Sequence, residues 1–305
     1  MVRNNSQPFR LLPFLCVFLV SILCATATFA QERADCRVFH SVVLRSPVHY
    51  CVFLPASYST AAAKERRYPV LYALHGLGGN EQSLAVSGEW TALQDLRRDQ
   101  KVGDFLVVAP DGWDTFYINS RDGMTRYGDF FLHEFLPYIE HAYRVQSGRA
   151  ARGITGFSMG GYGALRIAFG HPEIFGAVSA HSAALMRAPP AGVNAGASSG
   201  NPAARILTGV FGNPVDGAFW NLNSPFVLAR KNAALLSHMK IYFDCGTEDS
   251  FGFYTGASEM NKTLDDLKIP HEFHLYTGGH NISYLLAHRD ASFLFHSRAF
   301  AAVHQ

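Results

Sequence analysis

The chain has 305 residues, of which 48% are hydrophobic and 16% are charged, and its formal net charge at pH 7 is +2. This composition is typical of globular proteins and excludes disordered and collagen-like chains. A charge so close to neutral gives no electrostatic reason to expect a nucleic acid or another polyanion as partner. We therefore expect a folded protein without a nucleic-acid-binding surface; its oligomeric state is not predicted.

The N-terminal segment has the pattern of a secretory signal peptide. Arg3 and Arg10 precede an apolar run over residues 11–24, and small residues follow it. This run is shorter than the roughly 20 residues that a membrane-spanning helix needs. We expect a signal peptide over residues 1–30, a secreted or periplasmic protein without stable membrane insertion, and one large domain over residues 31–305.

Two cysteines near the start of the expected mature chain are candidates for a disulfide. The segments around Cys36 and Cys51 are typical of the two arms of an antiparallel hairpin. A turn centred near Val43 and Leu44 would place these cysteines directly opposite each other, where a bridge is possible. Export would permit it, so we expect this disulfide, with Cys245 as an unpaired, buried thiol.

Strands and helices alternate along the rest of the chain. Continuous apolar runs indicate strands that are buried on both faces, and apolar residues at helical spacing lie between them. This alternation predicts an α/β fold with a mostly parallel sheet and helices on both faces, to which the hairpin adds an antiparallel edge. The expected strands cover residues 68–74, 105–109, 154–157, 177–180, 239–244 and 271–276, and the expected helices cover residues 90–98, 130–139, 159–169 and 257–267.

One segment interrupts the alternation. Residues 185–236 separate two expected strands by far more than a crossover needs, and long insertions are often functional lids. We interpret this segment as a possible lid over an acyl pocket. Its large apolar side chains either wall that pocket or pack only against each other and the sheet, namely Leu207, Val210, Phe211, Phe219 and Trp220.

A serine between two glycines stands where an expected strand meets an expected helix, in Gly156-Phe157-Ser158-Met159-Gly160. This pattern is typical of a nucleophile elbow, a turn so tight that the flanking positions have no room for a Cβ atom. The serine backbone is then strained and its hydroxyl projects above the sheet. The alternative is a Gly/Ser loop without chemical function. The choice between these two interpretations depends on whether the chain also offers a base and a carboxylate.

A serine nucleophile needs a base, and His280 is the preferred candidate among 14 histidines. It follows the last expected strand through a glycine-containing loop, at the carboxyl end of the sheet, where ligands bind in open α/β folds. His75 and His181 occupy similar strand ends and are the alternatives.

The imidazole in turn needs a carboxylate, and the loop after the preceding strand offers Asp244, Glu248 and Asp249. Asp249 lies far enough along the loop to reach His280, whereas Glu248 would point away. Asp244 ends the strand, and we expect its carboxylate to order the turn through backbone N–H groups. The order Ser158, Asp249, His280 is the one found in α/β-hydrolases.

Backbone N–H groups can form the oxyanion hole for the tetrahedral intermediate. Met159 follows the nucleophile at a helix N-terminus, and Leu77 lies in the glycine-rich turn after an early strand. That turn lacks the Gly-Lys-Ser/Thr of a phosphate-binding loop, and we predict neither a metal site nor a cofactor.

Four motifs in this order resemble the esterase D-type family of α/β-hydrolases over roughly residues 36–300. The family includes S-formylglutathione hydrolases, feruloyl and acetylxylan esterases, tributyrin-type esterases and mycolyltransferases. The resemblance implies the α/β-hydrolase fold, a triad of Ser158, Asp249 and His280, and an oxyanion hole of the Leu77 and Met159 N–H groups. The motifs are His75-Gly76-Leu77-Gly78-Gly79, the segment from Gly156 to Ala164, Asp244-x-Gly246-x-x-Asp249-x-Phe251, and Gly279-His280-Asn281.

The chain also departs from parts of this family. Ile282 stands where the family often has a tryptophan, two residues after the catalytic histidine. The Ser-Pro-Arg-Gly segment of the cytosolic formylglutathione hydrolases is absent, and the loop at residues 117–120 is similar to that of exported short-chain and tributyrin-type esterases.

The sequence therefore predicts a secreted serine carboxylester hydrolase that acts through an acyl-enzyme on short-chain acyl or aryl esters. Its expected partner is a small-molecule or polysaccharide-linked ester. The alternatives are an acyltransferase to a sugar or lipid acceptor, and a non-catalytic binding module on the same fold.

Overall fold

The computed structural model of the chain describes residues 1, 31–198 and 200–302. Apart from its first residue, the predicted signal peptide lies outside the described residues. Within the described part, no helix is long and apolar enough to cross a membrane.

An eight-stranded sheet forms the centre of the molecule, in the strand order β1-β2-β4-β3-β5-β6-β7-β8. Strands β3 to β8 run parallel to one another, whereas β2 is antiparallel to both of its neighbours, β1 and β4. The predicted mostly parallel sheet with an antiparallel edge is confirmed. The strands are β1 (Arg33–Ser41), β2 (Ser46–Leu54), β3 (Val70–Leu74), β4 (Leu106–Pro110), β5 (Arg152–Gly156), β6 (Ala177–His181), β7 (Lys240–Gly246) and β8 (Glu272–Tyr276).

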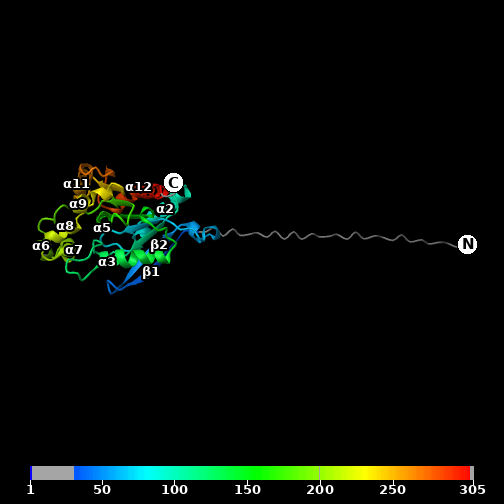
Figure 1. The fold of residues 1–305 in the computed structure, drawn as a ribbon, viewed down its shortest axis with the longest axis horizontal. Coiled ribbons are helices and arrows are strands. Elements are labelled where there is room, and N and C mark those ends of the chain that lie inside the picture. The colour runs from blue at the N-terminus through cyan, green and yellow to red at the C-terminus, as the bar shows by residue number, and fades with distance from the viewer. Residues whose placement is uncertain (2–30, 199, 303–305) are drawn as a thin grey trace.

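Helices cover both faces of this sheet, with α5 on one face and α12 on the other (Figure 1). The α-helices are α1 (Ser83–Val86), α2 (Glu89–Arg98), α3 (Tyr127–Phe130), α4 (Leu136–Ala142), α5 (Met159–Gly170), α6 (Val193–Ser198), α7 (Pro202–Phe211), α8 (Gly217–Asn223), α9 (Pro225–Lys231), α10 (Ala233–Leu236), α11 (Phe253–Asp266) and α12 (Ile282–Ala301). Short 3₁₀ turns cover Ala56–Ser59, Ala61–Ala63 and Arg149–Ala151.

The helix expected over residues 130–139 has a more complex form. It begins as α3, passes through a π-helical segment at Phe131–Phe135, and continues as α4. Pro137 lies in the first turn of α4, directly after the π-helical segment.

Helix α12 has no counterpart among the predicted elements. Its buried side includes Ser292 and His296, which join Thr155 and Ser179 in a hydrogen-bonded network against the sheet. Burial lowers the pKa of His296 to about 3, so its imidazole is neutral. These polar residues interrupt the apolar spacing from which an amphipathic helix is inferred.

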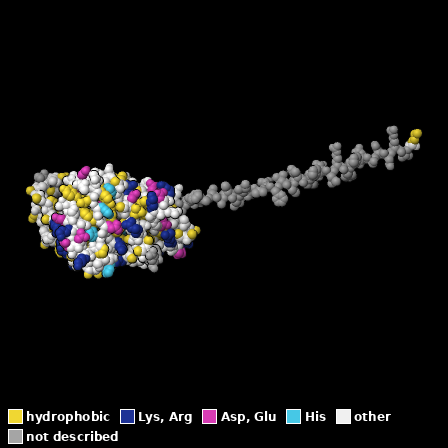
Figure 2. All heavy atoms as spheres, turned by 90° about the horizontal axis from the view of Figure 1, so that it is seen from above, with side chains coloured by type: hydrophobic (Ala, Val, Ile, Leu, Met, Phe, Trp, Pro, Cys, Tyr) yellow, Lys and Arg dark blue, Asp and Glu magenta, His cyan; other side chains and the backbone are white. Residues whose placement is uncertain are grey.

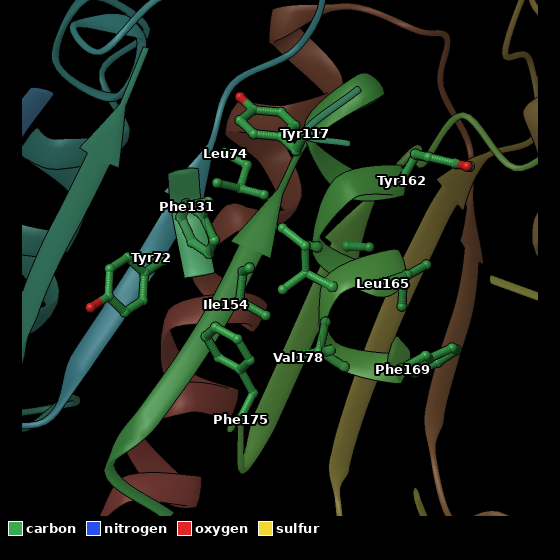
Figure 3. Packing of buried hydrophobic residues seen from close by; sticks show 14 of the residues in the cluster. Tyr72, Leu74, Tyr117, Phe131, Ile154, Tyr162, Leu165, Phe169, Phe175 and Val178 are labelled. Carbon is green, nitrogen blue, oxygen red and sulfur yellow. The ribbon is translucent and has the colours of Figure 1, made fainter. Parts of the chain in front are cut away.

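The largest hydrophobic cluster lies between the sheet and α5 (Figure 3). Tyr72, Ile154 and Val178 project from β3, β5 and β6, and Leu165 and Phe169 of α5 pack toward them (Figure 3). All of these side chains are nearly inaccessible to solvent. The strands next to the nucleophile motif are therefore held in place by close packing against α5.

The N-terminal hairpin has the predicted register. Cys36 pairs with Cys51 across β1 and β2, and their sulfur atoms form a disulfide with a Cα–Cα distance of 4.0 Å. Cys245 is free and fully buried, as predicted.

The insertion over residues 185–236 folds into helices α6 to α10, and α6, α7 and α8 gather at one end of the molecule (Figure 1). On the face shown in Figure 2, positive and negative side chains are interspersed, with hydrophobic side chains scattered among them.

Candidate active site

The motif around Ser158 forms a sharp turn between β5 and α5. Ser158 has φ 57°, in the left-handed region that side chains rarely adopt. A Cβ atom on Gly156 would lie 2.3 Å from the Gly160 backbone, and one on Gly160 would lie 2.0 Å from the Leu74 carbonyl oxygen. Both glycines are therefore required by close backbone approach, which is the geometry expected of a nucleophile elbow.

The structure brings Ser158, His280 and Asp249 together. The Ser158 Oγ atom lies 2.8 Å from His280 Nε2, and His280 Nδ1 lies 2.7 Å from Asp249 Oδ2. Asp249 also accepts a hydrogen bond of 2.9 Å from the Phe251 N–H through its other oxygen. Glu248, the other acidic residue of this loop, is exposed.

The charge on Asp249 decides the direction of these hydrogen bonds. Burial raises the pKa of this carboxyl, but the hydrogen bond and charge of His280 outweigh burial, so the pKa lies below its ordinary value. An ionised carboxylate can only accept, so His280 Nδ1 donates to Asp249 and Nε2 accepts from the Ser158 hydroxyl. This tautomer is the one in which an imidazole can remove a proton from serine.

Aromatic rings surround His280. The ring centroids of Phe157 and Phe251 lie 4.9 Å from that of His280, and Phe253 lies at 5.4 Å. These rings form an aromatic enclosure although Ile282 replaces the tryptophan that the family often has at its position. They restrict water around the imidazole and fix its orientation.

The two expected oxyanion donors face the same pocket as Ser158. Within the residues that the structure describes, neither the Leu77 N–H nor the Met159 N–H donates a hydrogen bond. Met159 is the first residue of α5, so its N–H belongs to the free amides at a helix N-terminus. Two unpaired donors beside a serine hydroxyl are what a developing oxyanion requires.

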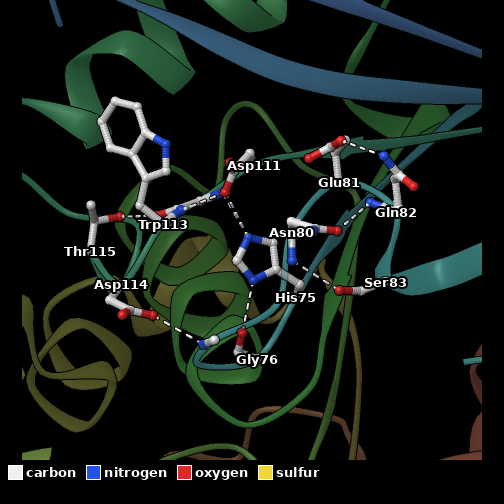
Figure 4. Close-up of polar contacts among 12 residues, drawn as sticks. His75, Gly76, Asn80, Glu81, Gln82, Ser83, Asp111, Trp113, Asp114 and Thr115 are labelled. Carbon is white, nitrogen blue, oxygen red and sulfur yellow. Dashed lines mark hydrogen bonds and ion pairs between the residues drawn. The ribbon is translucent and has the colours of Figure 1, made fainter. Parts of the chain in front are cut away.

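The turn that carries Leu77 is held by contacts that sequence reasoning missed (Figure 4). His75 Nε2 accepts a 2.7 Å hydrogen bond from the Gly112 N–H, and its Nδ1 donates to the Gly76 carbonyl at 2.8 Å. Asp114 Oδ1 accepts from the Gly78 N–H at 3.0 Å. His75, an alternative base in the sequence, therefore positions the turn and does not contact Ser158.

His181, the other alternative base, has its own carboxylate partner. Its Nδ1 lies 2.7 Å from Asp244 Oδ2, and Asp244 also accepts hydrogen bonds from the hydroxyls of Tyr242 and Tyr284. The prediction that Asp244 orders its loop through backbone N–H groups is therefore wrong. His181 and Asp244 are register partners at the ends of β6 and β7, a signal available only once the strand order is known.

A pocket of about 810 Å³ opens at Ser158. The insertion contributes Met186, Ile206 and Leu207 to its wall, which agrees with a lid interpretation. Of the five apolar residues singled out in the insertion, Leu207 alone lines the pocket. The other four belong to the hydrophobic core or pack against it, and the ring of Phe211 contacts those of Phe116, Tyr162, Phe219 and Trp220.

Across the described ranges, no group of three or more histidine, cysteine or acidic side chains is arranged to hold a metal ion. The residues around Ser158 offer a hydroxyl, an imidazole, a carboxylate and free backbone amides.

Comparisons with known proteins identify esterases as relatives of this chain. The family model described as "Putative esterase" matches residues 41–289. An esterase of Mycobacterium tuberculosis is 29% identical over 246 residues, which cover 75% of this chain and 51% of the relative. An acetyl esterase of Caldicellulosiruptor saccharolyticus is 27% identical over 181 residues, which cover 59% of this chain and 65% of the relative. The chain thus spans about half the length of the mycobacterial relative.

Solved structures show the same architecture. A ferulic acid esterase superimposes with a TM-score of 0.74 at 29% identity, over 88% of this chain and 99% of that one. An S-formylglutathione hydrolase from Agrobacterium tumefaciens, at 20% identity, has a TM-score of 0.69 over 89% of this chain and 96% of its own. The second similarity supports the fold alone, which is that of the α/β-hydrolases. Because the family model covers residues 41–289, well over half of the sequence, this chain belongs to that esterase family.

Proposed function

We propose that the chain is a serine carboxylester hydrolase with Ser158 as nucleophile, His280 as general base and Asp249 as the carboxylate that orients it. The observation that carries this proposal is the unbroken hydrogen-bond chain from Ser158 Oγ through both ring nitrogens of His280 to Asp249. Membership of an esterase family supports the same reaction class.

The reaction proceeds in two acyl-transfer steps. Ser158 Oγ attacks the ester carbonyl carbon while its proton passes to His280 Nε2, and the negative oxygen accepts hydrogen bonds from the Leu77 and Met159 N–H groups. Collapse of this intermediate breaks the bond to the alcohol, which leaves with the proton from His280. Water then attacks the acyl-enzyme by the same route and releases the acid, while Asp249 remains ionised throughout.

We further propose short-chain acyl or aryl esters, free or linked to polysaccharide, as substrates. The pocket volume lies within the range of small-molecule sites, and Met186, Ile206 and Leu207 give it an apolar wall. Relatives named acetyl esterase and ferulic acid esterase support both kinds of acyl group.

Export through an N-terminal signal peptide is part of the proposal. It is supported by the sequence pattern of residues 1–30 and by the Cys36–Cys51 disulfide, which persists in oxidising compartments. N-terminal sequencing of the protein recovered from culture medium or periplasm should begin near residue 31. Recovery of the full-length chain in the cytosol would contradict this part.

The test of the activity is hydrolysis of p-nitrophenyl acetate and butyrate by the wild type and by Ser158→Ala. The variant should lose several orders of magnitude in kcat while it keeps the wild-type circular dichroism spectrum. A fluorophosphonate probe should label Ser158 and no other serine. Labelling elsewhere, or an active Ser158→Ala variant, would remove the nucleophile assignment.

The same assay decides between water and another acyl acceptor. Repeated with a sugar alcohol present, it should yield free acid as the main product. Predominant transfer to the sugar would make the protein an acyltransferase, and absence of turnover with every ester would favour a binding module.

A further inference from the structure

The backbone that carries His280 has few contacts of its own. In the described part of the chain, neither Gly279 nor His280 makes a hydrogen bond through its backbone N–H or carbonyl group. The imidazole contacts Ser158 and Asp249, but these contacts alone do not fix a side chain whose backbone is free to shift. The position of His280 therefore depends on the residues on either side of this segment.

Tyr284, in the first turn of α12, contacts the segment on both sides of His280. Its backbone N–H donates to Asn281 Oδ1 at 2.9 Å, and Asn281 directly follows His280. On the other side, a Cβ atom on Gly278 would lie 2.8 Å from the Tyr284 ring, so the chain packs directly against that ring. The backbone around His280 is therefore held by Tyr284 at residues 278 and 281.

A buried carboxylate fixes Tyr284 in turn. The Tyr284 hydroxyl donates to Asp244 Oδ1 at 2.7 Å, and no other residue of the described structure forms a hydrogen bond with this oxygen. Both side chains are nearly inaccessible to solvent, so water does not replace this bond when it is lost. Because an unpaired, buried carboxylate oxygen is costly, the bond holds the Tyr284 side chain in one position.

Asp244 also contacts the strand that holds the nucleophile turn. Its Oδ2 accepts from His181 Nδ1 at 2.7 Å, and its carbonyl oxygen accepts from the Ser182 N–H at 2.8 Å. The His181 carbonyl oxygen accepts from the Ser158 N–H at 3.0 Å. A single residue therefore connects the end of β6, to which the nucleophile turn is hydrogen-bonded, with the start of α12, which holds the base.

We propose that Asp244 and Tyr284 are positioning residues, which fix the distance between the Ser158 hydroxyl and the His280 imidazole. This inference rests on the proposed esterase function and adds two residues that do not line the pocket. A shift of about 1 Å at a catalytic group can cost about a hundredfold in rate. The loss should stay below that of a triad residue, because the base is displaced and not removed.

A second tyrosine provides a matched control. The Tyr242 hydroxyl donates to Asp244 Oδ2 at 2.9 Å, and this side chain is also nearly inaccessible to solvent. Tyr242 lies on β7 two residues before Asp244, so its hydroxyl links no second segment to the carboxylate. Loss of either hydroxyl removes one hydrogen bond from Asp244, but only loss of the Tyr284 hydroxyl releases the segment around His280. The two tyrosines therefore separate positioning from a purely structural role.

The test compares Tyr284→Phe with Tyr242→Phe on p-nitrophenyl butyrate, at a temperature at which circular dichroism shows both variants folded. Tyr284→Phe should lower kcat about tenfold to a hundredfold and leave KM unchanged, because His280 acts in both acyl-transfer steps while the pocket stays intact. Fluorophosphonate labelling of Ser158 should slow in proportion. Tyr242→Phe should keep kcat within about threefold of the wild type. An unchanged kcat in Tyr284→Phe, a loss confined to KM, or equal losses in both variants would overturn the proposal.

If Tyr284→Phe does not fold, Asn281→Ala takes its place. Asn281 is exposed, so its replacement leaves the core intact, but it removes the acceptor for the Tyr284 N–H. We expect kcat to fall about threefold to tenfold at unchanged KM. The control is Asp216→Ala, which removes the cap of α8 outside the pocket and should keep the wild-type kcat. Equal kcat values for these two variants would contradict the positioning role.

Failure of the proposed function gives a different pattern. If the wild type hydrolyses no ester, the esterase proposal fails, and the distance from Ser158 Oγ to His280 Nε2 in crystals of the same variants takes the place of kcat. This distance is 2.8 Å in the wild type. It should exceed about 3.5 Å, beyond hydrogen-bond range, in Tyr284→Phe or its substitute Asn281→Ala, and stay unchanged in Tyr242→Phe. A hydrogen bond kept in all variants would then contradict positioning as well, whereas an active wild type with an unchanged kcat in Tyr284→Phe contradicts positioning alone.

Discussion

Asp244 lies near the end of β7 and Asp249 lies in the loop that follows, but the two carboxylates contact different histidines. Asp249 accepts from His280, which contacts Ser158, whereas Asp244 accepts from His181 and from two tyrosines. Each of the two carboxylates stabilises one imidazole. Only the pair that includes His280 contacts the Ser158 hydroxyl, so the loss of one carboxylate should differ in its effect from the loss of the other.

Asp249→Asn should lower kcat/KM at neutral pH by about 10⁴-fold, because an amide no longer holds His280 in the tautomer that accepts the serine proton. Asp244→Asn should cost much less activity. Steady-state kinetics of both variants, with circular dichroism to confirm folding, makes the comparison. The assignment within this loop would be wrong if folded Asp244→Asn were the inactive variant.

The stability effect of Asp244→Asn should depend on pH. The pKa of Asp244 is lowered in the fold, because the charge and hydrogen bonds of its partners outweigh the raising effect of burial, and the pKa of His181 is raised. The aspartate contribution is complete above the unfolded pKa of about 3.9 and is lost as pH falls through the lower folded value. The histidine contribution is complete below about 6.5 and is lost as pH rises through the higher folded value. Urea denaturation should therefore show the largest difference from wild type between about pH 4 and pH 6.5, and an equal difference at all pH values would contradict a charged pair.

Gly160→Ala tests the close approach at the nucleophile turn. An added Cβ would lie 2.0 Å from the Leu74 carbonyl oxygen, so we expect a loss of stability of a few kcal/mol and of most esterase activity. Gly209 in α7 is exposed and has no neighbour within 4 Å of an added Cβ, so Gly209→Ala should keep full activity and gain up to about 1 kcal/mol. Equal stability of the two variants would show that the turn can relax.

At the scale of elements, α7 shows how the insertion serves the site. Ile206 and Leu207 face the pocket, whereas Val210 and Phe211 are buried in the core that the helix covers. Asn201 caps the helix by accepting a hydrogen bond from the Ala204 N–H. A capped helix that is packed on one side gives the apolar pocket wall a fixed position.

Ile206→Trp should fill part of the pocket and lower kcat/KM for butyrate and aryl esters more than for acetate, since larger acyl groups lose the space they occupy. Arg205→Trp places the same bulk on the neighbouring exposed position and should leave the acyl-chain profile unchanged. A series from acetate to palmitate on wild type and both variants makes the measurement. Equal profiles for the two variants would mean that α7 does not limit the acyl group.

The elements that could be predicted from the sequence are those whose residues are all buried in apolar surroundings. The runs in β3, β4 and β6 are buried on both faces, so hydrophobicity alone indicated them. Helix α12 was missed because its buried side includes Ser292 and His296, whose hydrogen bonds form only against the sheet. Local sequence does not contain such tertiary partners.

The candidate site was predictable to a similar extent. Ser158, Asp249 and His280 stand in local motifs, so chain order was enough to select them. The pairing of His181 with Asp244 depends on the register between β6 and β7, and the roles of His75 and Asp114 depend on two loops that meet in space. For the same reason, the apolar residues of the insertion could not be divided between pocket and core.

At the scale of the whole molecule, the disulfide connects the edge strand β1 to the rest of the sheet. Cys36 and Cys51 enclose the hairpin turn, and β2 continues into the central strands through its pairing with β4. An edge strand has partners on one side only, so this link limits its separation from the sheet.

The double variant Cys36→Ala/Cys51→Ala should unfold at lower urea concentration, with a loss of about 2–4 kcal/mol in the free energy of unfolding. Its kcat should stay close to that of the wild type, because the disulfide lies in the β1–β2 hairpin and does not line the pocket. Unchanged stability would mean that the hairpin is held by packing alone.

The position of α12 sets the order in which the site is completed. His280 stands directly before this helix, whose first turn is capped by Asn281 and whose length packs on β5, β6, β7 and α2. In a chain that is synthesised from its N-terminus, the serine elbow can therefore fold well before its base has a fixed place. With His280 as the proposed base, a folding intermediate in which α12 is not docked should lack esterase activity, so the return of activity during refolding should follow the docking of this helix.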